Sequence, residues 1–382
     1  MRIGIITIED VHDKKAWSGI VYNIYHELCY RYGKENVVHI STRKTILERL
    51  YMFIQRIIAK LCRRQASLMN NFVAKQRAST MKNCINADID FLFAPAGSVD
   101  IAFLQSKIPI IYYSDATFKS MCSYYPNYDK ISSNKQKEAI SLEIKALNNS
   151  TICMFASHWA MNSAINNYHI PTEKTLLMEF GANIMDSDIT YTKREGLLQK
   201  IQIGETINIL FIGVDWERKG GQVAVDCVRC LNRDGYKSVL HVVGIKNMPK
   251  EVDDYIVENH GFLNKNKKED YDVIVNLLKT CDLFLLPTRA ECAGIVFAEA
   301  SAFGLPIFTY DTGGVSDYVI NGKNGYRLSL NSTGKDFACM IETVITRNKS
   351  GMLSEGGRNL YLDRLNWRCW GDRFNQLITN MR

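Results

Sequence analysis

The sequence predicts an α/β protein built from two Rossmann-like domains that face each other across a cleft. Short runs of β-branched and aliphatic residues recur along the chain, and each is followed by a longer stretch compatible with a helix. This alternation is typical of parallel sheets that are covered by helices on both faces. It occurs in two series, and 382 residues are more than one hydrophobic core ordinarily holds. Ligands bind such domains at the carboxyl ends of the strands, so the loops after the strands should carry the chemistry.

Each domain has its own series of predicted strands. The N-terminal domain, 1–185, is expected to contain strands at 2–7, 36–40, 90–94, 108–114, 150–156 and 175–180. The C-terminal domain, 207–365, is expected to contain strands at 207–213, 238–244, 281–287 and 305–310. A polar segment at 186–206 interrupts the alternation and is predicted to be the linker. The last segment, 366–382, has helical periodicity and is expected to pack back on the N-terminal domain.

Composition excludes several classes of protein. The chain is 46% hydrophobic and 23% charged, as globular proteins are, and it has no run of eighteen apolar residues. The N-terminal apolar run is too short for a signal peptide, so we expect a cytoplasmic protein. Its eleven cysteines are expected to be free thiols, and its histidines have no metal-ligand spacing, so no metal is expected. Asp88 and Asp90 have the spacing of a metal-binding pair, but they lead directly into a strand, where a solvated strand entry is favoured.

The net charge of +7 is concentrated in one segment, 43–82, which contains ten Lys and Arg residues and one acid, Glu48. This asymmetry indicates an anionic partner other than nucleic acid. Within the segment, 46–61 has apolar residues at helical spacing. The favoured interpretation is a domain helix that buries its apolar stripe and leaves its basic residues in water. The alternative is a helix that contacts an anionic membrane, at its inner face, or a lipid-linked acceptor.

Two strand-to-helix loops of the C-terminal domain are suited to phosphate. Arg218 and Lys219 follow the strand at 207–213, directly before the start of a helix, where free N–H groups and two cations favour an anion. Gly313 and Gly314 follow the strand at 305–310 and let the backbone approach a ligand, and a helix is predicted to begin at Val315. Together the loops predict a diphosphate site in one domain. The alternative for the basic turn, taken alone, is a solvated surface loop.

Two glutamates, Glu291 and Glu299, stand seven residues apart in an otherwise apolar stretch. Glu291 is predicted in the loop after the strand at 281–287, and Glu299 inside the helix that follows. Eight helical residues span about 12 Å, whereas the carboxylate pairs of glycosidases lie about 5–9.5 Å apart. Two separate contacts to one extended ligand therefore suit the pair better than one acid–base pair. The apolar neighbours of Glu299 argue against a solvated helix face.

At these residues the chain resembles the retaining nucleotide-sugar glycosyltransferases of the GT-B type, group 1 (family four). The Glu-x7-Glu stretch that runs into AFGLPIF and TGGVSDYVINGKNGYRL carries most of the resemblance, and WSGIVYNIYHEL, IPIIYYSDATF, FASHWAMNSAINNYHI and EFGAN extend it to nearly the whole chain. The chain departs from many members of this family at two positions. It has Val214 where they have Arg, and Ser114 where they have a His in the cleft.

The resemblance implies a role for each matching residue. Glu299 would accept hydrogen bonds from the nucleotide ribose, and Glu291 would contact hydroxyls of the transferred sugar. Arg218 and Lys219 would neutralise the diphosphate leaving group, and Asp115 would lie near the reacting carbon or the acceptor. The remaining donor-binding residues are expected to be Gly19, Gly261, Phe262, Leu263, Cys292, Ala293, Gly294, Gly313 and Gly314.

The resemblance also implies the reaction. A UDP- or GDP-sugar would be the co-substrate, with no other cofactor, and the acceptor would be a glycan or a lipid-linked molecule of cell-surface polysaccharide biosynthesis. The 1–185 domain would be the acceptor side and the 207–365 domain the donor side. Two alternatives stay open, a catalytically weak scaffold subunit with the same fold and a sugar-nucleotide epimerase.

Overall fold

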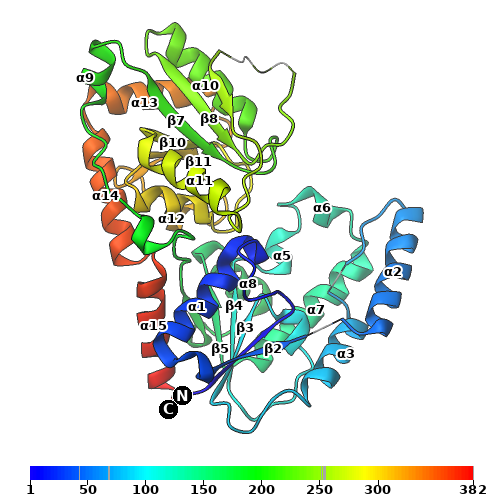
Figure 1. The fold of residues 1–382 in the computed structure, drawn as a ribbon. Coiled ribbons are helices and arrows are strands. Elements are labelled where there is room, and N and C mark those ends of the chain that lie inside the picture. The colour runs from blue at the N-terminus through cyan, green and yellow to red at the C-terminus, as the bar shows by residue number, and fades with distance from the viewer. Residues whose placement is uncertain (43, 68, 251, 253–254, 382) are drawn as a thin grey trace. The chain divides into compact units, whose positions relative to one another are not determined.

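The protein divides into two compact α/β units, Met1–Met178 and Glu179–Arg382 (Figure 1). The computed structural model describes residues 1–42, 44–67, 69–250, 252 and 255–381. Each unit contains one six-stranded sheet in which all strand pairs are parallel. The predicted fold class, two Rossmann-like domains, is confirmed. Among the described residues, no helix combines the length and the apolar character needed to cross a bilayer.

The sheet of the first unit has the order β2-β1-β3-β4-β5-β6. Its strands are β1 (Ile3–Thr7), β2 (Val37–Ser41), β3 (Phe91–Pro95), β4 (Ile110–Ser114), β5 (Ile152–Phe155) and β6 (Thr175–Leu177). The longer helices are α1 (Ile20–Tyr32), α2 (Ile46–Leu61), α3 (Asn71–Met81), α7 (Ser133–Asn149) and α8 (His158–Tyr168). Single-turn helices α4 (Ser98–Ile101), α5 (Phe118–Met121) and α6 (Pro126–Asp129) lie between them. Strands β1, β3 and β4 are buried along their whole length, which explains why they are continuous apolar runs in the sequence.

The sheet of the second unit has the order β12-β11-β10-β7-β8-β9. Its strands are β7 (Ile207–Ile212), β8 (Ser238–Val243), β9 (Val257–Asn259), β10 (Leu283–Leu286), β11 (Ile307–Tyr310) and β12 (Gly325–Leu328). Its helices are α9 (Leu197–Gln202), α10 (Gly221–Arg233), α11 (Lys268–Thr280), α12 (Ile295–Ala302), α13 (Gly334–Thr346), α14 (Ser350–Asp363) and α15 (Trp367–Asn380). The chain runs outward from β7 through β8 to β9 and then returns to β10 on the other side of β7. The switch point of this sheet therefore lies between β7 and β10, where ligands of such folds bind.

All ten predicted strands are present, with ends that differ by a few residues. Strands β9 and β12 were not predicted, because one has three residues of which two are exposed and the other begins with a glycine. The predicted linker segment contains α9 and a 3-10 turn, Asp186–Asp188. The predicted C-terminal helix is confirmed as α15, and Trp367 Nε1 donates a hydrogen bond of 3.0 Å to Asn183 Oδ1 within the same unit.

One helix has the opposite orientation from the one that was favoured. The helix predicted at 46–61 is confirmed as α2, but its apolar stripe is not buried. Its buried side chains are Glu48 and Met52 instead. The reason is an ion pair between Glu48 and the buried Arg77 of α3, which turns this face of α2 toward the unit. Figure 1 shows α2 at the periphery of the first unit, away from the strands.

Candidate functional site

The loop after β7 places two cations at the switch point of the second sheet. Arg218 N donates to Asp215 Oδ1 (3.1 Å), which closes the loop, and Arg218 Nη1 donates to the carbonyl oxygen of Ala290 (3.0 Å) in the loop after β10. The next residue, Lys219, is 8% exposed. The two cations thus come from one loop, and Arg218 ties it to the loop after β10.

Gly220 allows this close approach of the two loops. It precedes α10 with φ of 72°, a left-handed conformation that glycine adopts without strain. A Cβ atom at this position would lie 2.1 Å from the carbonyl oxygen of Pro287, so any other residue would separate the loops. The N-terminus of α10, a helix of thirteen residues, therefore lies against the start of the loop that carries Glu291.

Glu291 in the loop after β10 forms an ion pair with Lys219. The side chains are 16% and 10% exposed, respectively, so the two charges are largely removed from water. Gly314 N, in the loop after β11, donates to the carbonyl oxygen of Glu291 (3.0 Å). Three strand-end loops, those after β7, β10 and β11, therefore meet at Glu291.

Glu299 lies inside α12 and is 1% exposed, so the prediction that it does not occupy a solvated helix face is confirmed. Its Oε1 accepts a hydrogen bond of 2.5 Å from Lys265 Nζ. Its Oε2 is buried and has no hydrogen-bond partner among the described residues. A buried carboxylate oxygen is costly to leave without a donor, so this atom suits a ligand hydroxyl. Lys265 escaped the sequence analysis because it follows β9, the strand that was not predicted.

A pocket of about 390 Å³ lies at the ends of β7 and β8 and is lined by Val214, Trp216, Gly244, Ile245, Lys246, Asn247 and Phe262. Phe262, one of the predicted donor-binding residues, is 42% exposed, and Lys246 Nζ lies 5.2 Å from the centre of its ring. Its neighbour Gly261 accepts a hydrogen bond from Gly244 N (2.7 Å) through its carbonyl oxygen, and Leu263 is half-buried. An aromatic ring beside a cation suits a planar, polar group such as a nucleotide base.

The other predicted residues of this unit lie in the same loops. Cys292 and Ala293 are buried, and Gly294 precedes α12 with φ of 86°. Gly313 and Gly314 follow β11, and the helix that begins at Val315 is a 3-10 helix of only three residues. It has too few aligned peptides to act as a helix dipole, so of the two loops predicted to suit phosphate only the one before α10 is followed by a long helix.

The remaining two predicted residues, Gly19 and Asp115, belong to the first unit. Gly19 precedes α1 with φ of 89°, after Trp17 and Ser18, which also have positive φ. Asp115 follows β4 and is half-buried. The Trp17 and Tyr113 rings are 6.2 Å apart, centre to centre, which connects the two loops. The structure thus gathers the predicted residues of each unit at the carboxyl edge of that unit's own sheet.

One group of side chains among the described residues could hold a metal ion, and the sequence spacing gave no sign of it. His241 of β8 lies opposite Glu258 of β9, and His260 follows that strand. His241 Nδ1 lies 3.2 Å from His260 Nε2 and 3.4 Å from a Glu258 oxygen. Burial lowers the pKa of His241, which favours the neutral imidazole. None of the three was predicted as a site residue.

Comparison with known proteins finds similarity to glycosyltransferases. Residues 194–359 match the family Glycosyl transferases group 1. The chain is 30% identical over 135 residues to the lipopolysaccharide glucosyltransferase WaaG of Escherichia coli K12, which covers 35% of this chain and 36% of that protein. It is 24% identical over 185 residues to a GDP-mannose-dependent alpha-(1-6)-phosphatidylinositol monomannoside mannosyltransferase of Mycobacterium tuberculosis H37Rv, which covers 46% and 48%. The matched part spans less than half the length of either relative.

The crystal structure of Anabaena Alr3699/HepE in complex with UDP superposes over the full length of both chains, with a TM-score of 0.66 and 15% sequence identity. This likeness concerns the fold, and it includes both units. The family match covers β7 to β12 and therefore all the strand-end loops described above for the second unit. The chain has the GT-B fold, and residues 194–359 of its second unit match the group 1 glycosyl transferases.

Proposed function

We propose that the protein is a retaining, metal-independent glycosyltransferase. It would move a sugar from a nucleoside-diphosphate donor to a hydroxyl of a glycan or lipid-linked acceptor in cell-surface polysaccharide biosynthesis. The observation that carries this proposal is the meeting of Arg218, Lys219 and Glu291 at the switch point between β7 and β10. Such a site offers cations to a leaving group and a carboxylate to a sugar.

The chemistry requires positive charge where the leaving group develops negative charge. In glycosyl transfer the sugar becomes cation-like while an anionic diphosphate departs. Arg218 and Lys219 lie in one loop, in which Asp215 Oδ1 accepts from Arg218 N and the carbonyl oxygen of Ala290 accepts from Arg218 Nη1, so the loop and this guanidinium need little reorganisation. A bound diphosphate would give the ammonium of Lys219 a second anionic neighbour beside Glu291.

The configuration at the sugar carbon would be retained because the acceptor hydroxyl attacks the face that the leaving group vacates. The bond between the sugar carbon and the phosphate oxygen breaks as the bond to the acceptor oxygen forms. The acceptor proton passes to the departing phosphate oxygen, so no strong protein base is needed. Glu291 would then bind sugar hydroxyls, while its ion pair with Lys219 holds the carboxylate in place.

The donor would be a UDP- or GDP-sugar. The buried Oε2 of Glu299 would accept a ribose hydroxyl, and the pocket beside Phe262 would take the base. A solved structure with this fold contains UDP, and one relative is named as GDP-mannose-dependent, so both nucleotides deserve testing. The first unit, with Gly19 and Asp115, would serve the acceptor at the cytoplasmic face of the membrane.

A two-step experiment tests the proposal. Thermal unfolding is first measured with a panel of UDP-, GDP- and ADP-sugars, because a bound ligand stabilises the folded protein. Nucleotide release and sugar transfer are then measured with the donor that binds. Glu291→Ala should strongly reduce transfer while the protein stays folded, and Glu355→Ala, which removes an exposed carboxylate of the same unit, should keep full activity.

Three results would contradict the proposal. Full activity of Glu291→Ala would remove the role of the switch-point site. Conversion of the donor without any acceptor would indicate an epimerase. Absence of nucleotide release with every donor that binds would favour a scaffold subunit.

A further inference from the structure

Helix α2 has an amphipathic pattern that is turned outward. Its two buried side chains are Glu48, 1% exposed, and Met52, 7% exposed. Eight of its large apolar side chains are instead between 45% and 85% exposed: Ile46, Leu47, Leu50, Phe53, Ile54, Ile57, Ile58 and Leu61. A water-soluble surface rarely gathers so many large apolar side chains in one patch, and such patches mark interaction sites.

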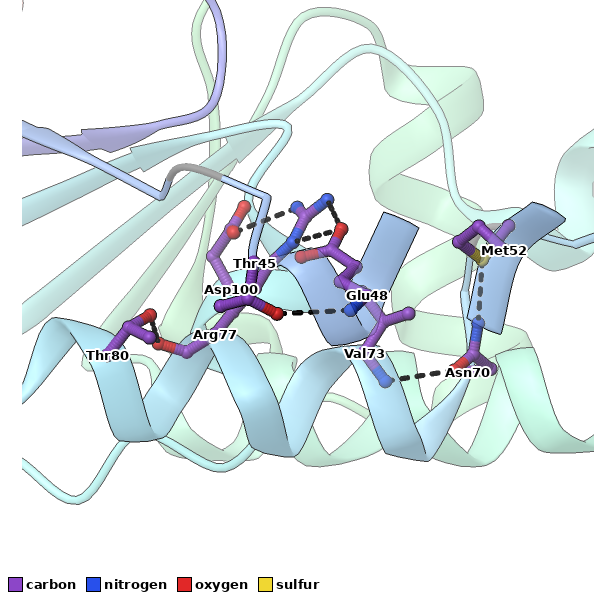
Figure 2. Close-up of polar contacts among 8 residues, drawn as sticks. All are labelled: Thr45, Glu48, Met52, Asn70, Val73, Arg77, Thr80 and Asp100. Atoms are coloured by element: carbon purple, nitrogen blue, oxygen red, sulfur yellow. Dashed lines mark hydrogen bonds and ion pairs between the residues drawn. The ribbon is translucent and has the colours of Figure 1, made fainter. Parts of the chain in front are cut away.

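A buried polar network fixes this orientation (Figure 2). Arg77 of α3 donates through Nη2 to Glu48 Oε1 (2.8 Å) and through Nη1 to Asp100 Oδ1 (3.0 Å) of α4. Thr45 Oγ1 caps the helix by accepting from Glu48 N (3.0 Å). One turn further on, Asn70 Nδ2 lies 3.6 Å from Met52 Sδ. Turning α2 to bury its apolar side would separate Arg77 from Glu48 in a buried environment, which is strongly unfavourable.

The second half of α2 lies beside an open space. A pocket of about 440 Å³ lies between Ile58, Ala59 and Cys62 on one side and Ser132 and Lys135 near the start of α7 on the other. The polar contacts that hold α2 come from Thr45, Glu48 and Met52, in its first half. The exposed apolar side therefore extends over the whole helix, while the anchor occupies its beginning.

The charges around this apolar side are positive. At about 100° per residue the exposed apolar side chains cover an arc of about 140°. Arg49, Arg56 and Lys60, all exposed, lie together along one edge of that arc. Lys44, before the helix, and Arg63 and Arg64, after it, are exposed as well. The one acid of the segment 43–82, Glu48, is buried in the network with Arg77, so it does not offset these cations at the surface.

The apolar arc of α2 and the cations along its edge together favour one kind of binding partner. In an antiparallel pairing, a second copy of the same face would bring its cations against identical cations, which is repulsive. A protein partner would need an apolar groove with acidic groups along one edge. An anionic bilayer offers acyl chains to the apolar arc and phosphates to the cations at the same time. At sixteen residues, about 24 Å, α2 would lie in the interface and not cross it.

We propose that α2 docks the first unit onto an anionic lipid surface, with its apolar arc among the acyl chains and with Arg49, Arg56 and Lys60 at the phosphates. The proposal goes beyond sugar transfer and does not depend on it. A failure to bind lipid would leave the proposed activity standing, and a failure of transfer would leave the docking surface standing.

Vesicle flotation of the full chain tests the proposal. Vesicles of pure phosphatidylcholine are compared with vesicles that contain phosphatidylglycerol, at low and at high salt. The chain should float with the anionic vesicles, and high salt should reduce this binding because exposed charges are screened. The triple variant Leu50→Ser/Phe53→Ser/Ile57→Ser should lose at least about tenfold in binding. The charge variant Arg49→Glu/Arg56→Glu/Lys60→Glu should lose binding to the anionic vesicles.

A matched control separates this surface from general stickiness. Met352→Ser/Leu362→Ser removes two apolar side chains of α14 that are 50% and 51% exposed, and it should bind vesicles as the unchanged protein does. Circular dichroism should show the same helix content in all variants, because none of the substitutions touches Glu48, Met52 or Arg77. Equal vesicle binding by the triple variant and the control would overturn the proposal. Absence of binding by the unchanged chain, with a dimer that the triple variant dissociates, would assign the surface to a second copy.

Discussion

Helices α12 and α2 each bury a glutamate, and we propose a ligand-binding role only for the one in α12. Glu299 and Glu48 are both 1% exposed, and each accepts from one basic side chain, Lys265 or Arg77. In each, the Oε2 atom is buried with no hydrogen-bond partner among the described residues. Burial, charge and pairing therefore do not distinguish the glutamate that we propose to bind a ligand from the one that anchors a helix.

Position in the fold makes the distinction. Glu299 lies in the helix that follows the switch-point strand β10, close in sequence to Glu291 and its ion pair with Lys219. Glu48 lies in an excursion between β2 and β3, where Arg77 also holds Asp100. The network therefore pairs two carboxylates with Arg77. Burial raises the pKa of Asp100, although Arg77 opposes this rise. Burial of a charged side chain therefore indicates a binding site only where the fold also places that side chain near a strand-end loop.

The largest expected effect concerns Lys219. Lys219→Ala removes a fixed cation of the proposed leaving-group site and should lower sugar transfer by about 10²–10³-fold, the loss typical for one stabilising group of a transition state. Lys268→Ala is the matched control, because Lys268 is exposed in the same unit and pairs with Asp272. Steady-state transfer rates measure both.

A double-mutant cycle adds a test of the pair. Lys219→Ala combined with Glu291→Ala should cost much less than the product of the two single losses, because the side chains contact each other. Independent, multiplicative losses would show that the ion pair is irrelevant to catalysis.

The next effect concerns the anchor of α2. Arg77→Met leaves Glu48 and Asp100 buried without their cation and should cost about 3–5 kcal/mol of stability. Arg2→Met removes an exposed pair with Asp88 and should cost about 0–1 kcal/mol. Chemical denaturation of the full chain measures both. Similar costs for the two variants would mean that the network does not fix α2.

The sequence was sufficient for the parts of the fold that depend on local pattern. Ten strands, helix α2 and the burial of Glu299 were all predicted, because apolar periodicity and turn residues report directly on such features. The loops after β7 and β10 were also predicted to carry site residues, and their role stays a prediction. Their meeting through Lys219 and Glu291 depends on the order of strands in the sheet, which no local pattern contains.

The features that escaped prediction depend on distant partners. Periodicity shows which residues of α2 share a face, but not which face points inward, and here Arg77 decides that. Lys265 was missed because β9 has only three residues and was not predicted, so in the loop after it only Gly261, Phe262 and Leu263 were assigned, from the family resemblance. The trio of His241, Glu258 and His260 was missed for the same reason, since it forms only when β8 and β9 pair.

A third buried glutamate sharpens the comparison. Glu143 of α7 accepts from Phe118 N (2.7 Å), and among the described residues no ion pair involves it. Burial raises its pKa to about 7, although hydrogen bonds from Tyr168 and Phe118 oppose the rise. Because the folded pKa lies above the unfolded value of about 4.5, the stabilising contribution of the neutral form is complete below that value. It is lost as the pH rises through about 7.

Glu143→Gln should therefore flatten the dependence of stability on pH between about 4.5 and 7, and the variant should gain stability relative to the parent chain at pH 8. Chemical denaturation of both proteins at pH 5, 6, 7 and 8 gives the difference in their free energies of unfolding. The contributions of the other titrating groups cancel in this difference. A difference that does not change with pH would show that Glu143 is ionised in the folded protein and has a partner of the kind that Glu48 has.

The smallest expected effect is that of metal chelation on sugar transfer. If Arg218 and Lys219 supply the charge that stabilises the leaving diphosphate, EDTA should leave sugar transfer unchanged, since no metal has to neutralise that charge. The metal-capable trio lies on β8 and β9, apart from the residues of the loop that carries Arg218. Transfer is measured after dialysis against EDTA, with and without added Mg²⁺ or Zn²⁺. Activity that disappears on chelation and returns with one ion would assign the charge to a metal, and the two cations of the β7 loop would then have a binding role like that of Glu299.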